Sequence, residues 1–140
     1  MKKYPVILAA LLLLLVISSC GDNPVQPEDN NTTSTQSKAS GADIYNSRCI
    51  SCHQATGEGM GSVYPPLAKS DYLADKGKTI SAVVNGLSGD ITVNGKTFSS
   101  AMPAQPLNDE EAAAVLNYVY SNWQNNGTVI TGAEVKASRK

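Results

Sequence analysis

The sequence predicts an all-α domain with one small β-hairpin, spanning about its last hundred residues. Apolar residues recur at helical spacing between Thr79 and Leu87, and again after Asn108. Two short β-branched runs flank Asn94-Gly95, the strongest short signal for a tight hairpin. We therefore expect a helical fold in which the hairpin forms a flap and not a sheet.

The first 19 residues are typical of a secretory signal, with a basic start and an unbroken apolar run at 6–17. The run ends in Ile17-Ser18-Ser19-Cys20, which resembles the lipobox of bacterial lipoproteins, where cleavage precedes the Cys and a lipid is attached to it. We expect a lipid anchor on Cys20. An ordinary cysteine near an ordinary cleavage site, or one inside an uncleaved membrane anchor, is the alternative.

Residues 20–38 comprise this Cys and a predicted tether. The segment 21–38 consists mostly of Asn, Thr, Ser, Gln, Pro and acidic residues, which cannot bury enough apolar surface to fold. Removal of residues 1–19 would take away two lysines and change the formal net charge from −1 to −3. No basic cluster is present, so the sequence gives no electrostatic support for nucleic-acid binding.

The domain is expected to occupy 39–140 and to begin with a helix over 41–49, for which Ser40 is a suitable N-cap. Residues 54–66 are dense in Gly and Pro and predict an irregular loop. A short helical turn is expected at 70–74.

The next helix is predicted over 79–87, where four apolar residues form a stripe and Gly86 frays the end. The strongest predicted helix starts after Asn108, with Glu111 placed for a capping box. Its apolar face comprises Ala112, Val115, Leu116, Val119, Tyr120 and Trp123. Residues 125–127 should end it, and the tail to Lys140 is amphipathic at best.

The chemistry of the chain is concentrated in Cys49-Ile50-Ser51-Cys52-His53, a C-x-x-C-H motif of c-type haem attachment. Two thiols three positions apart can reach the two vinyl groups of one porphyrin. The adjacent His53 can then present its imidazole to the iron. Apart from Cys20 these are the only cysteines, and His53 is the only histidine. We therefore expect one covalent haem c.

Three other interpretations fit the motif less well. A zinc site needs four ligands, and no further Cys or His remains in the domain to complete one. A thioredoxin-like redox pair belongs between a strand and a helix, which this pattern does not predict. A disulfide between Cys49 and Cys52 would close only a tiny loop and would leave the small apolar core unexplained.

A second axial ligand for the iron must come from a methionine, since there is no second histidine. Met102 is the better candidate because it lies far downstream, in a stretch that can cover the opposite face of the ring. Met60 follows His53 by only seven residues inside the Gly-rich loop. Met60, an open site, or plain core packing of either methionine remain the alternatives.

Residues 39–137 resemble the single-domain, class I cytochromes c. Gly41 and Tyr45 look like the contact of the N-terminal helix with the C-terminal one, where Val115 and Tyr118 match the facing positions. Two further segments match the pattern, namely Pro65-Pro66-Leu67 and Met102-Pro103. In the family the first proline carbonyl accepts the Nδ1 hydrogen bond of the haem histidine, which implies that role for Pro65 toward His53.

The resemblance implies an electron carrier with a His53 and Met102 ligated iron, and not an enzyme. It extends to a subgroup found both as free cytochromes and as haem domains of larger oxidoreductases. The expected partners are a terminal oxidase, a nitrite reductase or a dehydrogenase. A haem edge should be exposed between residues 54–66 and 92–98. Peroxidase-like or gas-binding activity would need an open sixth site, and a purely structural lipoprotein would have no haem.

The expected location is a periplasm-facing membrane surface, because haem c is attached outside the cytoplasm. Gly21 is not the Asp that favours inner-membrane retention in lipoproteins of this kind. We therefore expect the outer membrane. The outer face of the cytoplasmic membrane and the cell surface are the alternatives.

Overall fold

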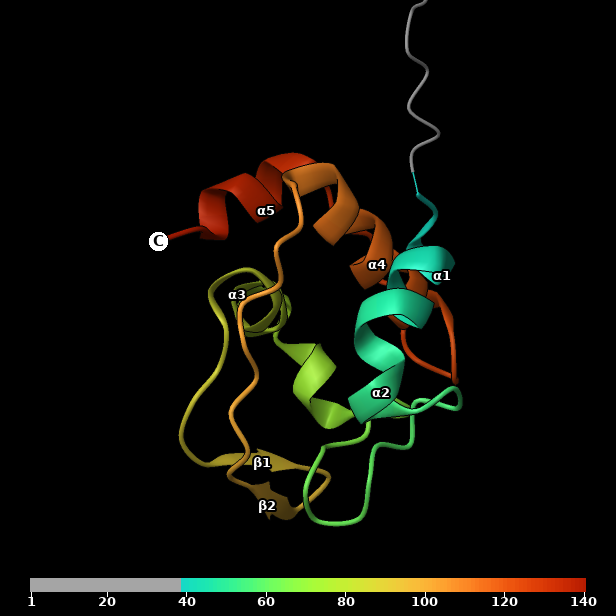
Figure 1. Ribbon diagram of the computed structural model, residues 1–140, viewed down its shortest axis with the longest axis vertical. Coiled ribbons are helices and arrows are strands. Elements are labelled where there is room, and N and C mark those ends of the chain that lie inside the picture. The colour runs from blue at the N-terminus through green and yellow to red at the C-terminus, as the bar shows by residue number, and fades with distance from the viewer. Residues whose placement is uncertain (1–38) are drawn as a thin grey trace, which may run out of the picture. The chain divides into compact units, whose positions relative to one another are not determined.

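Short helices and one two-stranded hairpin make up the regular structure of residues 39–140, the part of the chain that the computed structural model describes (Figure 1). The predicted signal, the predicted lipidation site at Cys20 and the predicted tether lie outside the described residues. Between residues 39 and 140, no helix is long and apolar enough to cross a membrane. The predicted all-α class with a hairpin is confirmed.

The first helix is a continuous run in three parts, α1 (Gly41–Ile44), the π-helical η1 (Tyr45–Cys49) and α2 (Ile50–His53). Ser40 caps it through a capping box with Asp43, as the sequence predicts for an N-cap. The helix runs on through the C-x-x-C-H motif to His53. The wide π-turn thus lies directly before and within the C-x-x-C-H motif, where such turns often mark functional sites.

The predicted turn at 70–74 is present as the 3₁₀ helix η2 (Asp71–Ala74). It is followed by α3 (Lys76–Asn85), which begins three residues earlier than predicted because the Asp75 side chain caps it at Lys78 N. Gly86 ends α3 with a φ of 79°, so it does not fray the helix but turns the chain sharply out of it.

The hairpin consists of β1 (Ile91–Val93) and β2 (Lys96–Phe98), antiparallel with Thr92 opposite Thr97. Asn94 and Gly95 both have positive φ, as the predicted type I′ turn requires. Asn94 and Asp71 exchange two hydrogen bonds, of 2.7 and 3.0 Å, between their side chains and backbone N–H groups. These two bonds fasten the flap to η2.

Helix α4 (Asp109–Ser121) has the predicted capping box, in which Asn108 and Glu111 each accept from the other's backbone N–H. It ends two residues before Trp123, which was expected on its apolar face. Trp123 and Gln124 have positive φ, so the chain has already left the helix there. Trp123 instead packs its ring against Tyr45 and Tyr118.

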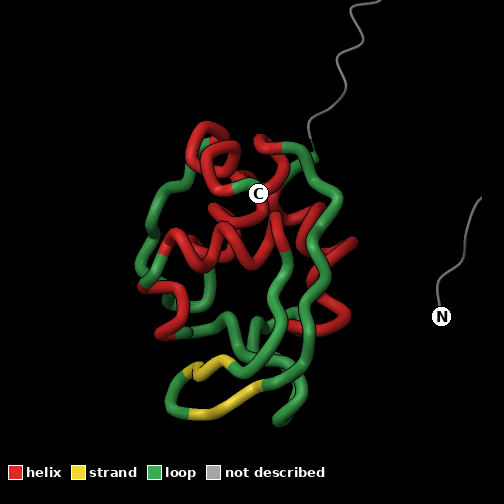
Figure 2. The backbone as a smooth tube through the Cα atoms, turned by 90° about the vertical axis from the view of Figure 1, so that its left-hand side faces the viewer, coloured by secondary structure: helices red, strands yellow, loops and turns green. Residues whose placement is uncertain are grey.

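The tail contains a helix that the sequence analysis did not predict, α5 (Gly132–Ser138). Thr131 caps it in a box with Glu134, and the T-x-x-E pattern that signals such a box is present in the sequence. Ile130 and Val135 are buried in the core beside α4. In Figures 1 and 2, α5 lies at the opposite end of the described part from the hairpin.

Helices α1 and α4 cross in close contact at Gly41. A Cβ on Gly41 would lie 2.1 Å from the Ala114 carbonyl oxygen and 2.9 Å from Cβ of Tyr118. The predicted contact with Tyr118 is thus present. Ala114 also contacts Gly41, and Val115 lines the cavity described below.

We expect Gly41→Ala to lower the free energy of unfolding by about 1–3 kcal/mol, because the added methyl group must push the two helices apart. Urea unfolding of the haem-loaded protein would measure it. Gly77→Ala is the matched control: its Cβ would meet only Asp75 Oδ1, at 3.5 Å, inside a helix. That change should be neutral or stabilising, by about 0.5–1 kcal/mol. Equal effects of the two substitutions would contradict the close-crossing argument.

Candidate cofactor-binding cleft

A cavity of about 80 Å³ lies between α3, α4, the hairpin and the loops that join them. Its walls are almost entirely apolar. They are formed by Leu67, Leu73, Ala82, Val83, Leu87, Ile91, Val93, Leu107, Val115, Leu116 and Val119. An adjoining cleft continues it toward Arg48, Cys52 and Pro103. The cavity is apolar, whereas the adjoining cleft adds polar groups, among them Arg48 and Ser51.

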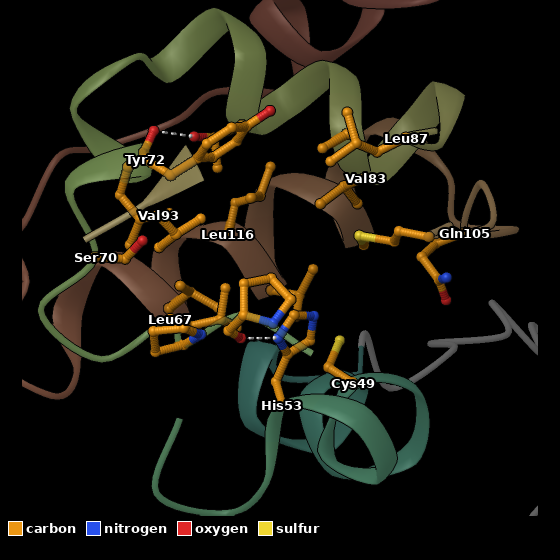
Figure 3. A pocket seen from close by; sticks show the side chains of 18 of the residues that line it. Cys49, His53, Leu67, Ser70, Tyr72, Val83, Leu87, Val93, Gln105 and Leu116 are labelled. Carbon is orange, nitrogen blue, oxygen red and sulfur yellow. Dashed lines mark hydrogen bonds between the residues drawn. The ribbon is translucent and has the colours of Figure 1, made fainter. Parts of the chain in front are cut away.

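His53 projects into this cavity from the end of α2 (Figure 3). Its Nδ1 lies 3.0 Å from the Pro65 carbonyl oxygen, the contact implied by the resemblance. Because a carbonyl can only accept, Nδ1 carries the proton and Nε2 keeps its lone pair. Burial lowers the pKa of His53, although the hydrogen bond to Pro65 works in the other direction. The neutral imidazole is thus oriented as a metal ligand.

The loop that presents Pro65 depends on two glycines with positive φ. A Cβ on Gly59 would lie 2.3 Å from the Tyr64 carbonyl oxygen and 2.6 Å from that of Pro65. A Cβ on Gly57 would lie 2.7 Å from the Trp123 ring. The predicted irregular loop is therefore tightly folded, and only glycine permits this path.

Cys49 and Cys52 are free, partly buried thiols beside His53. Burial raises the pKa of Cys49 to about 11, with Cys52 adding to the rise and Arg48 opposing it. A thiol with a raised pKa stays protonated at neutral pH, and a protonated thiol is a poor nucleophile. This argues against a thioredoxin-like pair. Within residues 39–140 there is also no group of three or more His, Cys, Asp or Glu side chains suited to hold a metal ion. The zinc alternative therefore has no ligand set there.

Met102 lines the same cleft as His53, on a segment that returns from the hairpin. Its backbone N–H and carbonyl each bond to Leu87 at 2.8 Å, and Gln105 N donates to the Val83 carbonyl. Met60, by contrast, has 46% of its surface exposed and does not line the cleft. The structure therefore brings Met102, and not Met60, to the cavity of His53.

These residues fit a haem. The cleft combines apolar walls with one neutral imidazole, one thioether and two thiols at its edge. A porphyrin needs an apolar slot, and a c-type iron takes nitrogen and sulfur ligands of these kinds. In Figure 3, His53 and Cys49 rise from one side of the pocket, and Val83 and Leu87 lie across from them.

Comparison with known proteins supports this interpretation. The sequence pattern of the family "Cytochrome c" matches residues 38–123. The chain belongs to the cytochrome c family. It is 39% identical over 92 residues to cytochrome c-552 of Thermus thermophilus, an alignment that covers 61% of this chain and 70% of that protein. To cytochrome c-551 of Bacillus subtilis it is 26% identical over 120 residues, covering 84% and 95% of the two chains.

A further relative is part of a larger system. The chain is 32% identical over 111 residues to the cytochrome c subunit of quinone alcohol dehydrogenase of Gluconobacter oxydans. That alignment covers 73% of this chain and only 23% of the relative. Proteins of this family bind haem c covalently and act as electron carriers or electron-transfer subunits, not as catalysts themselves. The chain is accordingly a haem c electron carrier, with Cys49 and Cys52 in the C-x-x-C-H position.

The contacts of several residues that support the cleft were not predicted from the sequence. Leu87 was expected only on a helix face, yet its backbone pairs with Met102. Gly86 allows this pairing, because a Cβ there would lie 2.9 Å from the Met102 carbonyl oxygen. Tyr120 OH donates to the Leu73 carbonyl oxygen, and Asn125 Nδ2 to that of Leu67. The local signal that the sequence offers is the Asn85-Gly86 step, which favours a turn before Leu87.

Proposed function

We propose that this chain is a membrane-anchored monohaem cytochrome that passes single electrons between respiratory or periplasmic redox proteins. In this proposal haem c is bonded to Cys49 and Cys52, and its iron is held by His53 and Met102. The observation that carries the proposal is the cleft itself, which both His53 and Met102 line, with the two thiols at its edge.

The histidine side is held by the hydrogen bond from His53 Nδ1 to Pro65. This bond fixes the tautomer and the ring orientation, and it raises the basicity of the Nε2 that would face the iron. Two covalent thioether bonds from the same helix would keep the macrocycle in register with the imidazole. Pro65 is thus a positioning residue that acts through His53.

The methionine side closes the site. A bound haem supplies a one-electron change between two oxidation states of its iron. Met102 in the sixth position would leave no place for a substrate at the iron. A thioether ligand would also favour the reduced iron more than a second histidine would. The apolar walls exclude water and act in the same direction. These properties suit electron transfer and not catalysis at the iron.

The partners that we propose are a terminal oxidase, a nitrite reductase or a dehydrogenase. The dehydrogenase has the most support, because relatives of this chain are named cytochrome c subunits of quinone alcohol dehydrogenase and of gluconate 2-dehydrogenase. In this proposal the adjoining cleft exposes the haem edge near Cys52, and partners dock at that edge. Docking of this kind is usually small and transient.

The location that we propose rests on the sequence of the first 38 residues. A lipid on Cys20 would tether the domain to the periplasmic face of the outer membrane, or else to the outer face of the cytoplasmic membrane or to the cell surface. Two or three acyl chains would hold it firmly where one would not.

The covalent haem can be tested with the double change Cys49→Ser and Cys52→Ser, expressed with a c-type maturation system. The wild-type chain should give a pyridine haemochrome spectrum of haem c and keep the haem after acid–acetone extraction. The double variant should lose it, because no thiol remains in the domain to bond the vinyl groups. Haem that resists extraction in the variant would refute the assignment.

Methionine ligation can be tested with Met102→Ala and with Met60→Ala as its matched control. The weak long-wavelength band that marks methionine–iron ligation in oxidised c-type cytochromes should vanish in Met102→Ala, and the reduced protein should gain CO binding at neutral pH. Met60→Ala should keep the band, because Met60 is exposed and outside the cleft. Loss of the band in Met60→Ala and its retention in Met102→Ala would instead identify Met60 as the ligand.

The anchor can be tested with Cys20→Ser in the full-length chain. The protein should shift from the membrane fraction to the soluble fraction of a detergent-free lysate, since the acceptor of the lipid is gone. Unchanged membrane fractionation would argue against lipidation at Cys20 and favour an uncleaved signal anchor.

A further inference from the structure

The segment after α4 reaches the methionine side of the cleft. The family match ends at residue 123, so α5 and its flanks lie beyond it. Ile130 and Val135 of this segment are nevertheless 2% and 0% exposed. Asn117 of α4 holds the backbone of Ile130 with two hydrogen bonds, of 2.7 and 2.9 Å. The segment is therefore firmly docked on the domain.

Helix α5 is fastened to both ends of α3. At the start of α3, Lys76 pairs with Glu134. At its end, Asn85 Nδ2 donates to the Ser138 carbonyl oxygen at 2.8 Å, and Asn85 Oδ1 accepts from Lys140 N at 3.1 Å. Asn85 directly precedes the Gly86-Leu87 step that pairs with Met102.

Arg139 bonds to the other side of the same region. Its Nη2 donates to the Leu107 carbonyl oxygen at 2.7 Å, and its Nε to Asp109 Oδ1 at 2.6 Å. Leu107 is where the segment carrying Met102 meets the start of α4. Lys140, next in the chain, lines a surface cleft together with residues 85–88 and 101–104. Residues 138–140 thus contact both segments that hold Met102 in place.

We propose that residues 138–140 form a clasp that keeps the Met102 segment closed over the cleft, with Arg139 as its main positioning residue. The proposal rests on the proposed ligation of iron by Met102. In it, the clasp sets how readily Met102 yields its position to an external ligand. Closure on the His53 side depends on the Gly-rich loop instead and is independent of it.

The contacts are suited to a local effect. Arg139 and Asp109 have about a third of their side-chain surface exposed, at 34% and 32%, so their ion pair adds little to global stability. The bond to the Leu107 carbonyl is charge-assisted and partly buried, so water screens it less than the exposed ion pair. Its loss should favour opening of the attached segment well before the whole domain unfolds.

The test is a titration of the oxidised, haem-loaded full chain with imidazole, followed by its visible absorption. Arg139→Ala should increase the affinity for imidazole at least about fivefold, because the Met102 segment opens more often. Asn85→Ala, which removes the hydrogen bonds from α3 to Ser138 and Lys140, should act in the same direction. An affinity within twofold of wild type in both folded variants would overturn the proposal.

Lys76→Ala is the matched control. Like Arg139→Ala, it removes an ion pair of the C-terminal segment. This pair joins α5 to the first residue of α3, about 13.5 Å from Asn85 at 1.5 Å per helical residue. Urea unfolding should shift to a similar small extent in Lys76→Ala and Arg139→Ala. Of these two variants, only Arg139→Ala should change the affinity for imidazole. An equal change in Lys76→Ala would show that the effect comes from lower overall stability and not from the clasp.

Met102→Ala separates this proposal from the one on which it rests. It should bind imidazole more tightly than wild type, and adding Arg139→Ala to it should change the affinity less than twofold, because the clasp acts through Met102. If Met102→Ala itself leaves the affinity unchanged, Met102 ligation and the clasp both fail. If Met102→Ala tightens binding but Arg139→Ala does not, only the clasp fails.

Discussion

The hydrogen bond between His53 Nδ1 and the Pro65 carbonyl is the interaction on which the candidate site depends. It orients the only histidine of the chain as a candidate metal ligand, while burial in the apolar cavity favours the neutral imidazole by lowering its pKa. It also requires the chain to fold back within twelve residues. That path is open only because Gly57 and Gly59 adopt positive φ and pass closely against Trp123 and the Tyr64 carbonyl.

The part of the cavity lined by Met102 is held by a different set of contacts. Met102 is placed by backbone pairing with Leu87, which the sharp turn at Gly86 permits. Neither wall belongs to one long element, so the cleft is an assembly of short pieces around α4. The crossing of α1 over α4 at Gly41 fixes where the helix that carries the C-x-x-C-H motif lies relative to α4, which lines the cavity.

Much of the fold was predictable because its signals are local. The capping box of Asn108 and the Asn94-Gly95 turn each depend on residues within a few positions of one another, and both formed as expected. Helix ends were less certain: Asp75 starts α3 early, and the chain leaves α4 before Trp123. Helix α5 had a local signal at Thr131, but its stability comes from burying Val135 against distant residues.

The sequence by itself determined the chemistry, because three adjacent constraints, two thiols and one imidazole at C-x-x-C-H spacing, admit few functions other than haem c attachment. It also ranked Met102 above Met60. Only the tertiary structure decided that Met102 lines the cavity of His53 while Met60 stays exposed. The physical reason is that this choice depends on pairing between segments far apart in the chain, such as Leu87 with Met102, which leaves no periodic mark in the sequence.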